Sequence, residues 1–174
     1  MKILVFHGVA AICGLLMSFI FSQDSAAQDA PFRGLSVSVG YYDINSNDDE
    51  ATDFRVEYRS SYDLAFQIRP FLGAELTTDG SYLIGGGFLR DISLGNSFYL
   101  TPSLGAFYYE EGESTLDLGH PLEFRTQIEI GYQTKNKHRV SLGFSHISNA
   151  SLDENNPGAE ILSLYYHFPL HVTK

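Results

Sequence analysis

The sequence predicts an all-β protein, an eight-stranded antiparallel up-and-down transmembrane β-barrel. Apolar and polar residues alternate in segments that recur along the 174-residue chain, and no helical period competes with them over a comparable length. The 16 glycines, 11 tyrosines and 13 phenylalanines suit many strands and tight turns. The segments run about 8–14 residues, which is right for tilted membrane-spanning strands.

The N-terminus precedes these segments and has a different character. A near-continuous apolar run from Ile3 to Phe21 is followed by the small residues 25–27. We predict a signal peptide over 1–27, cleaved after Ala27, which leaves 28–174 as a single barrel domain. A retained membrane anchor is the alternative. Because Cys13 lies within the run, the mature chain is expected to contain no cysteine and no disulfide.

The first four predicted strands span about 34–43, 53–60, 64–77 and 81–93. In each of the first three, apolar residues occupy one parity and polar residues or glycine the other, whereas the fourth is rich in glycine and its facing is ambiguous. The apolar members are Leu35, Val37, Val39 and Tyr41, then Phe54, Val56 and Tyr58, then Phe66, Ile68, Leu72 and Leu76.

The last four predicted strands span about 97–109, 122–134, 138–148 and 160–170, and they alternate in the same way. Their apolar parity includes Phe98, Leu100, Leu104, Ala106 and Tyr108, then Leu122, Phe124, Ile128 and Ile130, then Val140, Leu142 and Phe144, then Leu162, Leu164, Tyr166, Phe168 and Leu170. Short connections alternate with longer polar ones along the chain. This predicts a meander with tight turns facing the periplasm and longer loops facing the exterior.

The polar parity predicts what fills the barrel. It carries four arginines and four glutamates, which suit a narrow lumen of paired charges: Arg55, Arg59, Arg69, Arg125, Glu57, Glu75, Glu123 and Glu129. A soluble lipocalin-like barrel with an apolar interior is the alternative. The net charge of −10, with no basic stripe, argues against a nucleic-acid partner.

Three polar residues interrupt the apolar parity at the outer end of the last two strands. His146 and Ser148 lie two residues apart on one strand, and Glu160 begins the next. We predict Ser148 as nucleophile, His146 as general base and Glu160 as the acid that orients the imidazole. Pairing across the loop is expected to place Glu160 beside Ser148 and diagonal to His146. The alternative is a strand end in the headgroup zone, where such residues are ordinarily tolerated.

A serine that attacks an ester also needs hydrogen-bond donors for the developing oxyanion. Asn149 directly follows the predicted nucleophile, and Asn156 lies in the connecting loop, within the segment 156–158. Either amide, or backbone N–H groups of the turn, can fill this role. A plain turn is the alternative for 156–158.

The segment His146-Ile147-Ser148-Asn149-Ala150, followed by nine residues and Glu160, resembles the lipid A 3-O-deacylases of Gram-negative outer membranes. The resemblance implies that His146, Ser148 and Glu160 form a lipid-facing Ser-His-Glu triad, with Asn149 and Asn156 near the oxyanion. It implies hydrolysis of the 3-hydroxyacyl chain at position 3 of lipid A or lipopolysaccharide, at the outer leaflet of the cell outer membrane. Ser151 stands where the family usually has glycine. No metal or cofactor is expected.

Other functions remain open at this point. A structural or adhesive eight-stranded barrel would use none of the three residues chemically. An outer-membrane phospholipase or acyltransferase would use the same triad. Assembly into a homodimer is a further alternative. A pore is the weakest alternative, because eight strands leave little lumen and this one carries many charges.

Overall fold

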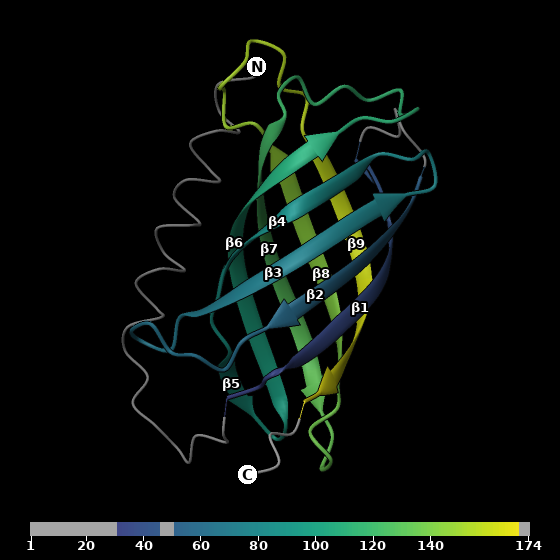
Figure 1. The fold of residues 1–174 in the computed structure, drawn as a ribbon. Helices are drawn as coiled ribbons and strands as arrows, with labels where there is room; N and C mark the ends of the chain where they lie inside the picture. Colours follow the sequence, from purple (N-terminus) through teal and green to yellow (C-terminus); the bar gives the residue numbers. More distant parts are fainter. Residues whose placement is uncertain (1–30, 46–50, 171–174) are drawn as a thin grey trace, which may run out of the picture. The chain divides into compact units, whose positions relative to one another are not determined.

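Nine strand segments form one sheet that closes on itself, as the ribbon in Figure 1 shows. The computed structural model describes residues 31–45 and 51–170, so the predicted signal segment 1–27 lies outside the described residues. The segments are β1 Gly34–Tyr41, β2 Thr52–Arg59, β3 Arg69–Thr77, β4 Tyr82–Leu89, β5 Ile92–Gly95, β6 Phe98–Glu110, β7 Leu122–Gln133, β8 Arg139–Ser148 and β9 Ala159–Pro169.

The connectivity is the predicted antiparallel meander. Sequential neighbours pair from β1 to β4 and from β5 to β9, and β1 pairs with β9 to close the barrel. Both β4 and β5 pair with β6, so together they form the fourth of eight barrel strands. The closed, eight-stranded antiparallel barrel is therefore confirmed.

Two predicted strand ranges were wrong in detail. The third strand begins at Arg69 rather than at 64, because Phe66 and Gln67 take left-handed φ values of 53° and 65° in a tight hairpin. The fourth is interrupted between Leu89 and Ile92. There the Asp91 carboxylate accepts a hydrogen bond from Thr101 Oγ1 at 2.6 Å, which the regular alternation of a continuous strand does not anticipate.

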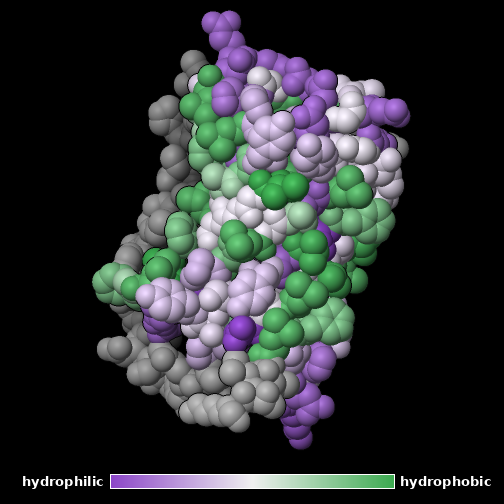
Figure 2. All heavy atoms as spheres, viewed as in Figure 1, coloured by the Kyte–Doolittle hydropathy of each residue, from purple (hydrophilic) through white to green (hydrophobic). Residues whose placement is uncertain are grey.

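The two faces of the sheet differ as the alternation predicted. Charged residues of one parity point into the barrel, where Arg55 is 3 % exposed and Glu75 is 2 % exposed. Apolar residues of the other parity point outward, where Leu72 is 66 % exposed. In Figure 2 the apolar side chains gather over the middle of the barrel, and strongly polar ones concentrate toward its upper and lower ends. This inverts a lipocalin-like barrel and fits strands that cross a membrane.

Ion pairs between neighbouring and facing strands fill the interior. Arg55 Nε lies 2.9 Å from Glu75 Oε2, and Arg59 Nη2 lies 2.6 Å from Glu129 Oε1. Arg125 bridges Glu57 and Glu75. Pairing offsets much of the cost of burying these charges, so the network accounts for charged residues inside the barrel.

No helix within residues 31–45 and 51–170 is long and apolar enough to cross a membrane. The longer connections, 111–121 and 149–158 among them, lie at the upper end of the barrel in Figure 1. The short connections, such as 134–138, lie at the lower end. The candidate site residues occur where β8 and β9 reach the upper end.

Candidate active site

His146 and Glu160 face each other across the β8–β9 ladder. Their Cα atoms are register partners, and His146 Nδ1 lies 2.9 Å from Glu160 Oε1. Both side chains belong to the outward parity, and they are 43 % and 26 % exposed. A carboxylate at this distance accepts the Nδ1–H of a neutral imidazole, which leaves the lone pair on Nε2. In this pair the basic nitrogen is Nε2 of His146, and Glu160 binds the other nitrogen, Nδ1.

Ser148 lies one outward position beyond His146 on β8 and is half-buried. Its register partner on β7 is Phe124, and the partner of His146 on that side is Thr126. The structure thus brings the three predicted residues to one end and one face of the barrel. Within the described ranges, no hydrogen bond joins Ser148 Oγ to the imidazole. Catalytic hydrogen bonds are often long or poorly aligned before substrate binds.

The expected register between the last two strands was wrong. Glu160 lies opposite His146, not beside Ser148. In the β8–β9 connection, Ala150 and Ser151 adopt left-handed φ values of 54° and 66°. This register joins acid and base directly rather than along a diagonal. The left-handed φ of Ser151 also gives a physical reason for a glycine at that position in the resembled family.

The side chain of Asn149 hydrogen-bonds the β6–β7 and β8–β9 connections to each other. It is fully buried, and its Nδ2 donates to Leu118 O at 2.9 Å and to Asn155 O at 2.8 Å. Its backbone N–H donates to Asn156 Oδ1 at 3.0 Å. All of its N–H hydrogens are used, so in this arrangement Asn149 offers no donor to an oxyanion. The sequence-based expectation for its side chain is corrected on this point.

Asn156 is the remaining oxyanion candidate of the two. Its Oδ1 accepts the hydrogen bond from the Asn149 backbone, which fixes the orientation of the amide group. The Nδ2 of Asn156 has no hydrogen-bond partner among the residues that the structure describes. An amide whose oxygen is held in this way presents its N–H₂ in a defined direction.

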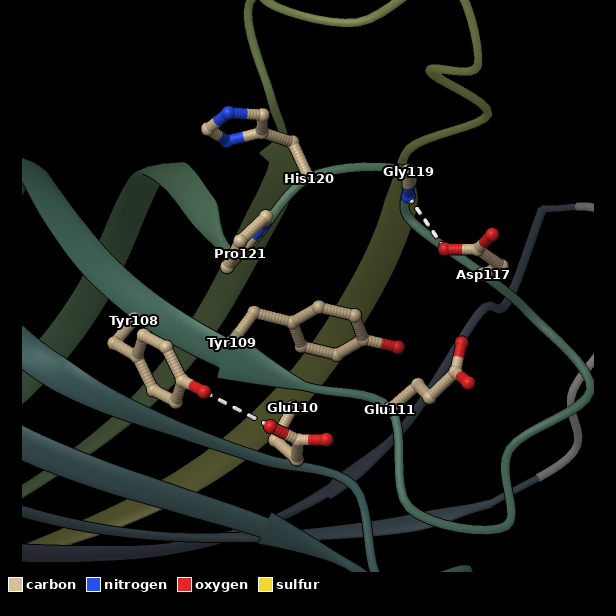
Figure 3. A pocket seen from close by; sticks show the side chains of 8 residues that line it. All are labelled: Tyr108, Tyr109, Glu110, Glu111, Asp117, Gly119, His120 and Pro121. Carbon is tan, nitrogen blue, oxygen red and sulfur yellow. Dashed lines mark hydrogen bonds between the residues drawn. The ribbon is translucent and has the colours of Figure 1, made fainter.

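A separate hollow lies beside the β6–β7 connection, at the same end of the barrel (Figure 3). It has a volume of about 240 Å³ and is lined by Tyr108, Tyr109, Glu110, Glu111, Asp117, Gly119, His120 and Pro121. None of the three predicted catalytic residues lines it. Across residues 31–45 and 51–170, no group of three or more His, Cys, Asp or Glu side chains is arranged to hold a metal ion.

Sequence reasoning missed one neighbour of the imidazole. A Cβ built on Gly158 would lie 2.9 Å from His146 Cε1, so the glycine packs directly against the ring. Its φ of +73° also requires the left-handed region, which favours glycine. The sequence of 156–158 predicts a turn and an amide donor, and no pattern in one sequence signals a contact between a loop glycine and a strand histidine.

Comparisons with known proteins give matches that include this part of the chain. The family model described as lipid A 3-O-deacylase (PagL) matches residues 86–169, which include the candidate site. Lipid A deacylase PagL of Bordetella bronchiseptica is 31 % identical over 75 residues. That match covers 42 % of this chain and 42 % of the relative, so it spans less than half of the relative's length.

Solved structures support the fold. The crystal structure of the outer membrane enzyme PagL superposes with a TM-score of 0.61 at 21 % identity, covering 78 % of this chain and 99 % of that one. Neisserial surface protein A gives a TM-score of 0.55 at 11 % identity, covering 83 % of this chain and 100 % of that one. The chain thus shares the fold of these barrels, and its similarity to the lipid A 3-O-deacylase (PagL) family model covers residues 86–169, which hold the candidate site.

Proposed function

We propose that this barrel is an outer-membrane esterase that hydrolyses the 3-O-linked 3-hydroxyacyl chain of lipid A with Ser148, His146 and Glu160. The hydrogen bond between His146 Nδ1 and Glu160 Oε1, on the outward face and one step from Ser148, is the observation that carries the proposal. The similarity of residues 86–169 to the lipid A 3-O-deacylase (PagL) family model suggests the substrate class, and the site suggests the residues.

The chemistry follows from the tautomer that Glu160 holds. His146 Nε2 removes the proton from Ser148 Oγ as the oxygen attacks the ester carbonyl. The tetrahedral intermediate collapses to an acyl-serine, and the imidazolium returns its proton to the departing 3-hydroxyl oxygen. A water molecule, deprotonated by the same nitrogen, then releases the fatty acid and restores Ser148. Glu160 stabilises the imidazolium in both halves, and Asn156 Nδ2 donates to the oxyanion.

The surroundings suit an amphiphilic substrate. The outward positions below the site on the same two strands are apolar and exposed, with Phe144 at 44 % and Leu162 at 38 %. Such a surface meets lipid chains in the plane of a membrane, so acyl chains can lie along it while the ester reaches Ser148. We infer that the site works at the outer leaflet, because it lies at the barrel end that carries the longer loops.

Mass spectrometry of lipid A tests the proposal. Purified, folded protein is incubated with lipid A and, separately, with phospholipid. We expect loss of one 3-hydroxyacyl chain from lipid A, no release with Ser148→Ala and nearly none with His146→Ala. His138→Ala, a histidine at the opposite end of the barrel, is the matched control and should retain activity. Acyl release from phospholipid alone would reassign the same triad to a phospholipase.

A further inference from the structure

Two residues lie beside the imidazole of His146: Glu160 on β9 and Gly158 at the end of the β8–β9 connection. Glu160 holds Nδ1 at 2.9 Å, and Gly158 lies beside Cε1, the carbon between the two ring nitrogens. A Cβ on Gly158 would be 2.9 Å from Cε1 and 3.6 Å from Nε2. The first distance is shorter than real Cβ contacts, so any side chain at 158 must displace the ring.

Two further contacts hold Gly158 in this place. The Asn149 N–H donates to Asn156 Oδ1, and Asn149 Nδ2 donates to Asn155 O, so the loop is bonded to its own first residue just before Gly158. Gly158 itself is buried, and Ala159 directly begins β9. The backbone at 158 therefore has little freedom to retreat from the imidazole.

We propose that Gly158 is a positioning residue, which keeps the His146 imidazole against Glu160 with Nε2 turned toward Ser148. The inference rests on the proposed function and deepens it. His146 is 43 % exposed, so its ring is not fixed by general packing. The hydrogen bond fixes Nδ1, and Gly158 beside Cε1 limits rotation of the ring toward the loop.

A methyl group tests this directly. In Gly158→Ala the added carbon pushes the imidazole from its place, and we expect kcat on lipid A to fall roughly 10- to 100-fold, since small displacements of catalytic groups cost that much. KM should change less than twofold, because the lipid-binding surface is untouched. The same variant made in the His146→Ala background should lower residual activity no further, since no ring remains to displace.

Gly80→Ala is the matched control. Gly80 lies in a loop at the same end of the barrel with a similar φ of +79°, but a Cβ there meets nothing within 4 Å. It carries the same backbone penalty without the contact. We expect Gly80→Ala to leave kcat within twofold of the original chain. Equal losses in both alanine variants would overturn the proposal and assign the effect to backbone strain.

A second measurement separates positioning from activity. Imidazole ¹⁵N and ¹H resonances of His146, assigned by comparison with His146→Ala, report the Nδ1 hydrogen bond without substrate. We expect them to shift in Gly158→Ala and to stay in place in Gly80→Ala. Unchanged resonances would overturn the positioning role. If the original chain fails to deacylate lipid A but these shifts occur, the proposed function fails and the positioning role stands.

If Gly158→Ala does not fold, Asn156→Ala provides the second variant. It removes the Oδ1 acceptor that closes the loop and adds no bulk near the ring. The loop can then withdraw from His146, and we expect broadened or shifted imidazole resonances. Sharp resonances at the original positions would count against Gly158 as a positioning residue.

Discussion

His146 on β8 and Glu160 on β9 are register partners whose side chains meet at 2.9 Å on the outward face of the barrel. Because the two strands are hydrogen-bonded along their length, the relative height of acid and base is set by the ladder rather than by a loop. Sites on rigid elements hold their geometry better than sites on loops. Two members of the proposed triad, His146 and Glu160, thus lie within the paired strands. The third, Ser148, is the last residue of β8.

Glu160→Gln should reduce deacylation sharply while leaving the barrel folded. A glutamine amide can donate to Nδ1, which favours the tautomer with the proton on Nε2, so Ser148 loses its base. The comparable change in a serine protease triad lowers kcat on the order of 10⁴-fold. Steady-state release of hydroxyacyl chains measures the effect. Glu110→Gln, an exposed carboxylate at the same end, should remain active; equal activity in both variants would exclude Glu160 from the triad.

Asn156→Asp separates the two roles of that amide. The carboxylate keeps the oxygen that accepts the Asn149 N–H, so the loop stays closed. It loses the Nδ2 donor and brings a negative charge toward the oxyanion. We expect kcat to fall at least 10²- to 10³-fold, the cost of one lost oxyanion donor. An active aspartate variant would show that the donor comes from elsewhere, with backbone N–H groups of the turn as the next candidates.

Asn149→Ala should loosen the loops 111–121 and 149–158 more than it affects chemistry. The change removes the hydrogen bonds from Nδ2 to Leu118 O and Asn155 O, each worth about 0.5–1.5 kcal/mol. Hydrogen exchange should then increase in 111–121 and 149–158, with the strands unchanged. Leu152→Ala, an exposed loop position, is the comparison and should leave exchange unaltered. Unchanged protection in Asn149→Ala would mean that the loops are held by other contacts.

Arg125→Met should destabilise the barrel. It leaves the buried carboxylates of Glu57 and Glu75 without one of their partners, and breaking a buried pair costs about 3–5 kcal/mol. Urea unfolding in lipid vesicles measures the change in the free energy of unfolding. Lys135→Met in an exposed turn provides the control and should stay within about 0.5 kcal/mol. A stable Arg125→Met barrel would argue that the lumen relaxes to re-pair its charges.

Leu142→Arg tests which face meets lipid. Leu142 is 48 % exposed on the outward parity of β8, and an arginine on a lipid face costs about 2–4 kcal/mol near the bilayer midplane. Leu152→Arg, in the loop beyond β8, is 54 % exposed and should cost little. Equal stability of both variants in vesicles would place the apolar belt outside the bilayer.

Strict alternation made most of the fold predictable, because a period of two assigns each residue to a face without further information. The charges at Arg55 and Glu75 therefore fell inside and Leu72 outside, as expected. The break before β5 was not predictable. It depends on Asp91 turning to Thr101, Arg69 and Arg139, which lie on other strands.

The candidate site was predictable in its residue types and its face. The register of β8 with β9 was not predictable. The number of residues between two strands does not reveal how many of them continue the strand pairing and how many form the turn. In the structure, Ala150 and Ser151 turn with left-handed φ, and Glu160 pairs opposite His146. The burial of Asn149 was also hidden, since its partner Leu118 comes from a different loop.

The ladder that joins β8 to β9 also determines when the site can exist. A chain in transit, with its last strand unpaired, keeps base and acid apart by the full length of the connecting loop. A slip of one residue during pairing would turn Glu160 toward the lumen and leave His146 without a partner. Esterase activity of this chain is therefore expected only after β8 and β9 have paired in the native register. Nascent and misassembled copies should not hydrolyse the lipids around them.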